Sequence, residues 1–242
     1  MLSTADIKRI RSLAQKKFRD ESGLFVVEGE KMVAEALASS FAVEAVYRRE
    51  EIGEKAMERI SSLSSPSPAL AVVRQKPESP LTLPDKGLCL VLDGIRDPGN
   101  LGTLLRIAAW FGIAAVYVSP DCVDWYNPKV VQATMGALFR VPFHTADLPT
   151  LCRSVAAKGG KVYGTFLDGA DLYSRPLSNG EEAPALLLIG NEADGIRPDV
   201  AETVTDRLFI PRYPACAEGQ ESLNAAVAAA VAVAEFRRRA TR

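Results

Sequence analysis

The sequence predicts an α/β protein whose larger, C-terminal part contains a parallel β-sheet. Short apolar segments alternate with helix-like segments along most of the chain. Two of them, LCLVL at 88–92 and ALLLIG at 185–190, are continuously apolar, as is typical of parallel strands buried on both faces. A polar stretch with three prolines, 77–87, reads as a linker, so we expect a small α/β domain at 1–76 and a larger domain at 88–242.

Apolar spacing places the individual elements. In the first part we expect helices at 7–19, 30–38 and 52–63, and strands at 24–27, 43–47 and 70–73. In the second part we expect strands at 88–92, 114–118, 140–143, 161–166, 185–189 and 207–210. Helices there are expected from a Gly-rich turn to about 111, and at 129–138, 148–158 and 221–238.

Composition excludes several classes of protein. The chain has 242 residues, 48% hydrophobic and 24% charged, which excludes a mostly disordered protein. A net charge of −1 argues against a uniformly basic coat protein but leaves room for a local basic patch. The four cysteines form no CxxC pair and the single histidine is His144, so we expect no metal site. The N-terminus has no secretory signal and the longest apolar run, 225–234, is too short for a membrane span, so we expect a cytoplasmic protein.

Positive charge is concentrated near the N-terminus. Within 1–20, two acidic residues oppose six basic ones: Lys8, Arg9, Arg11, Lys16, Lys17 and Arg19. Lys and Arg side chains bind nucleic acids by neutralising phosphates. A solvated helix face explains the segment equally well, and both interpretations stay open.

Three stretches carry polar residues in apolar surroundings. In the first, LDGIRDPGNLGTLLRIAAWFG at 92–112, a strand leads through a tight turn into a helix. We expect Asn100 to be the N-cap of that helix. Asn100, Thr103 and Arg106 form a polar stripe on an otherwise apolar helix, which favours a functional role for Arg106 over a surface position.

The second stretch, LLLIGNEADGI at 186–196, places Gly190 directly after a buried strand. This is the carboxyl edge of the sheet, where α/β proteins bind ligands. The glycine spacing resembles a phosphate-binding loop, but Ile196 and Arg197 stand where such a loop needs Lys and Ser or Thr, which excludes it. Glu192 is explained equally well as a helix-start carboxylate or as a functional group.

The third stretch, at 208–239, runs from a strand ending in Ile-Pro through a loop into an Ala-rich helix that begins with E-S-L-N. A terminal helix that closes the core explains most of it. It leaves Asn224 unexplained, because we expect this residue inside the first turn, where asparagine has modest helix propensity.

Together and in this order, the N-x-x-x-x-x-R helix, the G-N-E-x-x-G turn and the I-P…E-S-L-N helix resemble the three motifs of the SpoU (TrmH) family of RNA ribose 2′-O-methyltransferases, in the SPOUT superfamily. The resemblance covers about 88–238. The segment IKRIRSLAQKKFRDESGLFVVEGEKMVAEAL resembles the family's substrate-binding domain, a small ribosomal-protein-like RNA-binding fold. The resemblance implies a trefoil knot in the sheet domain, S-adenosyl-L-methionine as cofactor, and a homodimer.

The resemblance also implies roles for single residues. Those expected to hold the cofactor are Gly190, Ile210, Leu223, Asn191 and Thr165. The family's polar catalytic positions match Asn100, Arg106, Glu192, Ser222 and Asn224. The loop from Arg212 to Gln220 is longer than is usual in the family, and its contacts stay open.

The implied activity is methyl transfer to a ribose 2′-hydroxyl of structured RNA, with ribosomal RNA favoured by the two-domain layout. Transfer RNA methylation and a non-catalytic RNA-binding or ribosome-assembly protein stay as alternatives. A small-molecule enzyme would leave the basic first domain without a purpose. Because arginine stays protonated, we interpret Arg106 first as a clamp on the RNA phosphate and the developing alkoxide, while a role as base stays open.

Overall fold

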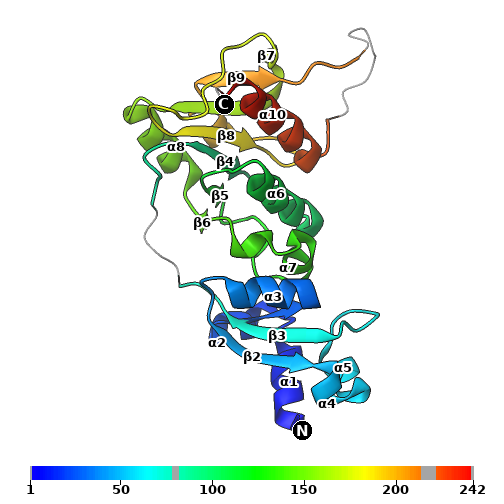
Figure 1. Cartoon of the computed structure of the whole chain (residues 1–242). Coiled ribbons are helices and arrows are strands. Elements are labelled where there is room, and N and C mark those ends of the chain that lie inside the picture. Colours follow the sequence, from blue (N-terminus) through cyan, green and yellow to red (C-terminus); the bar gives the residue numbers. More distant parts are fainter. Residues whose placement is uncertain (1, 78–81, 214–221, 241–242) are drawn as a thin grey trace. The chain divides into compact units, whose positions relative to one another are not determined.

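The computed structural model describes residues 2–77, 82–213 and 222–240 (Figure 1). Its contacts divide the chain into two compact units. Unit 1 comprises Met1–Glu78 and Asp124–Arg140, and unit 2 comprises Ser79–Val123 and Val141–Arg242. The segment 124–140 therefore packs with the first 78 residues, although it lies between two strands of unit 2 in the sequence.

Unit 1 is built around a three-stranded antiparallel sheet in the order β1-β3-β2. The strands are β1 (Leu24–Glu28), β2 (Val43–Arg48) and β3 (Ala69–Arg74). The central strand, β3, is buried along nearly its whole length. The helices of this unit are α1 (Thr4–Ser12), α2 (Lys16–Ser22), α3 (Glu30–Ala38), α4 (Arg49–Ile52), α5 (Glu54–Ile60), α7 (Pro128–Thr134) and the 3₁₀ turn η1 (Ala137–Phe139).

Two helices predicted as continuous are broken in the structure. The expected helix 7–19 ends at Ser12 and restarts at Lys16. The Arg19 guanidinium fills the break, where its Nη1 donates to the carbonyl oxygens of Leu13 at 2.8 Å and Ala14 at 2.9 Å. The expected helix 52–63 is likewise interrupted at Gly53, whose φ of +84° lies outside the helical region.

Aromatic rings attach the segment 124–140 to the rest of unit 1. The Phe25 ring lies 4.7 Å from that of Tyr126, and the Phe41 ring lies 5.2 Å from that of Phe139, centroid to centroid. Such pairs contribute beyond the area they bury. The segment therefore belongs to the core of unit 1.

Unit 2 contains a six-stranded sheet in the order β6-β5-β4-β8-β7-β9, and every neighbouring pair is parallel. The strands are β4 (Leu88–Leu92), β5 (Val116–Val118), β6 (Phe143–Thr145), β7 (Lys161–Asp171), β8 (Ala185–Ile189) and β9 (Asp206–Phe209). The helices are α6 (Pro98–Trp110), α8 (Leu148–Ala157), α9 (Pro198–Ala201) and α10 (Ala225–Arg239). Strands β4 and β8 are buried at every residue, which confirms the parallel sheet predicted from their continuous apolar runs.

Several predicted boundaries in unit 2 were wrong. The strand expected at 140–143 lies at 143–145, because Arg140 closes the 3₁₀ turn instead. Asp97, rather than Asn100, caps α6 by accepting the Asn100 N–H at 2.8 Å. Asn224 lies outside the first turn of α10 and is its N-cap. The trefoil knot stays a prediction.

Candidate active site

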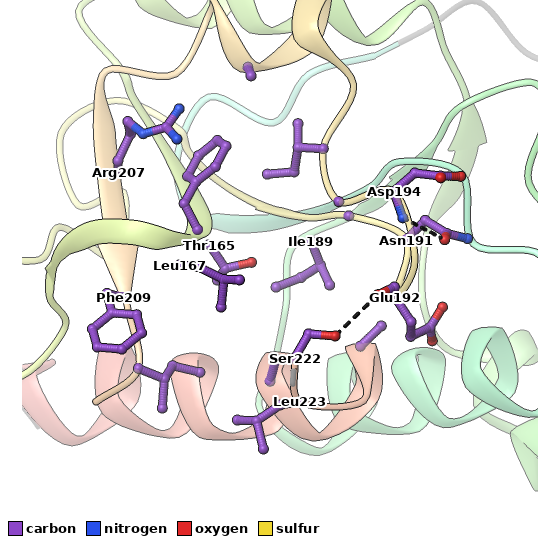
Figure 2. A pocket seen from close by; sticks show the side chains of 18 of the residues that line it. Thr165, Leu167, Ile189, Asn191, Glu192, Asp194, Arg207, Phe209, Ser222 and Leu223 are labelled. Carbon is purple, nitrogen blue, oxygen red and sulfur yellow. Dashed lines mark hydrogen bonds between the residues drawn. The ribbon is translucent and has the colours of Figure 1, made fainter. Parts of the chain in front are cut away.

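A cavity of about 1140 Å³ lies in unit 2 at the carboxyl ends of three neighbouring strands, β7, β8 and β9, and at the start of α10 (Figure 2). This is the sheet edge at which the sequence predicted a ligand site. Its floor combines apolar side chains of Ile189 and Phe209 with the backbone of the turn that follows β8. All five residues predicted to hold a cofactor line it: Thr165, Gly190, Asn191, Ile210 and Leu223.

The turn after β8 is closed by its own backbone. Asn191 and Gly195 exchange two backbone hydrogen bonds of 3.0 and 2.9 Å. The Asn191 side chain adds one hydrogen bond inside the turn and one outside it. Its Oδ1 accepts from the Ala193 N–H at 2.8 Å, and its Nδ2 donates to the carbonyl of Gly94, after β4, at 2.8 Å. A Cβ atom on Gly190 would lie 2.2 Å from the carbonyl carbon of Gly195, so only glycine fits there.

A buried carboxylate fixes the end of the same turn. Asp93 directly follows β4, and its side chain is 0% exposed. It accepts from the Arg197 backbone N–H at 2.7 Å and from Arg197 Nε at 2.8 Å. Burial alone would lower the pKa of Arg197, but the carboxylates of Asp93 and Asp121 raise it above its ordinary value. The sequence prediction missed Asp93, whose only signal was its position after a buried strand.

Side chains from the three polar stretches meet beside the cavity, which two of them, Glu192 and Ser222, also line. Asn100 Nδ2, from α6, donates to Glu192 Oε1 in the turn after β8. Asn224 Nδ2 donates to Asn100 Oδ1 at 2.9 Å, and Ser222 Oγ donates to the Glu192 carbonyl at 3.1 Å (Figure 2). Asn224 also accepts from the Ala226 N–H, so one side chain caps α10 and joins the cluster. We call Asn100, Glu192, Ser222 and Asn224 the polar cluster.

The sequence and the fold are similar to those of known proteins. The profile of the SpoU rRNA Methylase family matches residues 87–234, which is more than half of the chain. The chain belongs to the SpoU rRNA methylase family. A second profile, that of an MRM3-like substrate binding domain, matches residues 4–72.

Relatives of this SpoU-family chain include 23S rRNA (guanosine-2′-O-)-methyltransferases. RlmP of Bacillus subtilis is 33% identical over 96% of this chain and 95% of its own length. A TrmH-family protein from Porphyromonas gingivalis, described as an RNA methyltransferase, has a TM-score of 0.88 and 39% identity, covering 99% of this chain and 100% of its own. An AdoMet-bound rRNA methyltransferase from Sinorhizobium meliloti has a TM-score of 0.86 and 29% identity, covering 100% and 98%.

One predicted catalytic residue of the SpoU-family chain lies apart from the polar cluster. Arg106 is exposed on α6, six residues and therefore about 9 Å of helix beyond Asn100. Like Asn100 and Asn224, it is not among the described residues that line the cavity. The structure thus brings four of the five predicted catalytic side chains together and leaves the role of Arg106 as a prediction.

The basic residues near the N-terminus divide into two groups. Lys8, Arg9, Arg11, Lys16 and Lys17 are exposed. Arg19 is 2% exposed and donates from Nη2 to Asp124 at 2.6 Å, so its charge is used inside unit 1. The prediction that Arg19 contacts RNA was therefore wrong, because a side chain that holds a helix break together is not available to a phosphate.

The remaining predictions concern the longer loop and metals. Arg212 lines the cavity, and Tyr213 beside it is 99% exposed. The rest of the loop, 214–220, lies outside the described residues. Within 2–77, 82–213 and 222–240, no three His, Cys, Asp or Glu side chains are grouped so that they could hold a metal ion. The same ranges contain no helix long and apolar enough to cross a membrane.

Proposed function

We propose that this chain transfers a methyl group from S-adenosyl-L-methionine to a ribose 2′-hydroxyl of ribosomal RNA. The observation that carries the proposal is the polar cluster, in which three separate motifs meet beside one cavity. RlmP of B. subtilis, similar along nearly its whole length, is a 23S rRNA guanosine 2′-O-methyltransferase. A protein similar over the whole chain binds AdoMet.

The residues around the cavity fit this cofactor. The apolar side chains of Ile189, Phe209 and Leu223 suit the faces of an adenine ring, and the exposed backbone of the Gly190 turn offers hydrogen-bond groups to a nucleoside. Glu192 adds a carboxylate to the cavity wall, which complements a positively charged ligand. When bound, the cofactor supplies an electrophilic methyl group on a sulfonium sulfur.

The chain's own residues supply position and charge. Because the methyl donor is already activated, the attack depends on in-line positioning of the ribose oxygen more than on an acid. We propose that the polar cluster orients the ribose. Arg106, which is exposed on α6, then acts first as a clamp on the RNA phosphate and the developing alkoxide.

The decisive experiment separates cofactor binding from methyl transfer. We expect Arg106→Ala to bind the cofactor with unchanged affinity but to lose methyl transfer by about 100-fold or more, because a clamp acts mainly in the transition state. Calorimetry with S-adenosylmethionine and labelled methyl incorporation into ribosomal RNA provide the two readouts. Normal turnover in this variant would remove Arg106 from the mechanism. A wild-type chain that binds no cofactor would instead favour a non-catalytic RNA-binding protein.

Domain roles follow the same proposal. Residues 1–76 would bind the substrate RNA through five exposed basic residues, Lys8, Arg9, Arg11, Lys16 and Lys17. Residues 77–87 would link this domain to the second one, residues 88–242, which would carry out catalysis. A structure from work on tRNA 2-OH methylation matches only 64% of this chain, whereas the S. meliloti rRNA methyltransferase matches 100%, which favours ribosomal over transfer RNA.

We further propose a cytoplasmic homodimer. Helices α6 and α10 contact each other, and both expose large apolar side chains, with Trp110 85% and Val227 49% exposed. A second copy of the chain would cover such surface. Sedimentation of the wild-type protein tests this, with Trp110→Lys expected to shift the equilibrium toward the monomer.

A further inference from the structure

A bulge in β7 places a short segment over the cavity. Strand β7 pairs with β9 in two stretches, and Leu208 lies opposite both Thr165 and Ala170. The residues between them, 166–169, are therefore extra in the ladder. A Cβ atom on Gly169 would lie 2.5 Å from the carbonyl carbon of Leu208, so the bulge returns to the ladder through a glycine. Bulges of this kind redirect side chains beside functional sites.

The bulge holds a guanidinium over an aromatic ring. Arg207 Cζ, from β9, lies 3.5 Å from the centroid of the Phe166 ring. The same guanidinium donates from Nη2 to Asp168, and this hydrogen bond lowers the pKa of Asp168 below its ordinary value. Phe166 in turn packs against the sheet core. Ring, carboxylate and core thus fix the orientation of the Arg207 side chain.

Part of the Arg207 side chain stays accessible at the cavity wall. The Arg207 side chain is 42% exposed and lines the cavity (Figure 2). Phe166 also lines the cavity. Leu167, 59% exposed, adds an apolar contact to the same wall. Asp168 accepts a hydrogen bond from Arg207 Nη2 and offsets the positive charge, which makes a phosphate a less favourable ligand here. A planar ring that stacks on the free face needs neither the N–H groups nor the full charge.

We propose that Arg207, backed by Phe166, is a stacking platform for a nucleobase in this cavity. Guanidinium planes and aromatic rings are the surfaces on which unpaired bases stack in RNA-binding proteins. The assignment rests on the proposed function, which brings two bases to the cavity: the adenine of the cofactor and a base of the RNA. They share one chemistry, and binding measurements with each ligand separate them.

The test uses Arg207→Ala and Arg207→Lys in the full chain, with S-adenosylhomocysteine and transcribed 23S rRNA as probes. Lysine keeps the charge but has no plane, so stacking predicts that both variants bind at least one probe about tenfold more weakly. Loss with S-adenosylhomocysteine alone assigns the cofactor's adenine, and loss with RNA alone assigns an RNA base. Arg175→Ala is the matched control, because Arg175 is similarly exposed and also paired with a carboxylate, that of Asp206, but does not line the cavity.

Two results would contradict the stacking platform while leaving the proposed function intact. Wild-type affinity in Arg207→Lys would show that charge rather than the plane matters, and wild-type affinity of both variants for both probes would show no contact. Thermal unfolding of each variant confirms that the fold is kept. If the wild-type chain binds neither probe, the proposed function itself fails and the platform with it.

Discussion

The most deeply buried charged residue of unit 1 and that of unit 2 are used differently. In unit 1 Arg19 is 2% exposed, and in unit 2 Asp93 is 1% exposed. Each forms an ion pair and also bonds to backbone at a point where the chain changes direction. Arg19 donates to a backbone carbonyl oxygen, and Asp93 accepts from a backbone N–H. Arg19 joins two helices to the segment 124–140, whereas Asp93 fixes the turn that carries Gly190 and Glu192. Burial of charge therefore does not by itself mark a functional site; what the charge holds in place does.

The largest effect is expected at Asp93. Asp93→Ala removes the acceptor of two hydrogen bonds and should lower the free energy of unfolding by about 3 kcal/mol, the lower end for breaking a buried pair, because Arg197 is partly exposed. It should also weaken cofactor binding, because the Gly190 turn loses its anchor. Urea unfolding and calorimetry measure the two. A variant that is destabilised but binds the cofactor normally would break the distinction between Asp93 and Arg19.

Arg19→Met tests the other half of the comparison. The substitution keeps an apolar stem but removes the donor to Asp124 Oδ2 and to the carbonyl oxygens of Leu13 and Ala14. We expect a loss of about 2 kcal/mol in the free energy of unfolding. Cofactor affinity should stay at the wild-type value, since the change lies within unit 1. A drop in cofactor affinity would show that Arg19 acts on the site.

Another buried charge in unit 2, that of Glu235, adds a dependence on pH. Arg238 and then Arg239 hydrogen-bond Glu235 on α10 and lower its pKa from 4.5 to about 2. Because the folded-state pKa is depressed, the stabilisation is complete above pH 4.5 and is lost as the pH falls toward 2. Glu235→Gln should cost about 1 kcal/mol at neutral pH, with the difference from wild type vanishing near pH 2. A constant difference across that range in acid titrations of stability would contradict this account.

The smallest effect is expected from the exposed lysines of unit 1. Lys16→Ala with Lys17→Ala should leave stability nearly unchanged, because both belong to exposed i,i+4 pairs. If the two lysines contact phosphates, the slope of log affinity for RNA against log salt becomes shallower by roughly 1–2. Lys158→Ala, an exposed lysine of unit 2, is the control. An unchanged slope would remove this helix from the RNA contact.

Local sequence patterns predicted the parts of the structure that depend on local physics. Continuous apolar runs placed β4 and β8 at their observed bounds. The resemblance carried by the three polar stretches, rather than local physics, implied five catalytic side chains, of which four meet. The helix break before Lys16 was not predictable, because it depends on Arg19 bonding to Asp124, over a hundred residues away. The same holds for Asp93, whose role appears only when β4 lies beside β8.

The position of 124–140 in the chain limits how this protein can be divided. The backbone passes between the two units at three places, after residues 78, 123 and 140. Removing the first 76 residues would therefore expose the rings of Tyr126 and Phe139 to solvent, because Phe25 and Phe41 would no longer cover them. To express unit 2 without unit 1, the segment 124–140 must also be removed and Val123 joined to Val141 by a new linker.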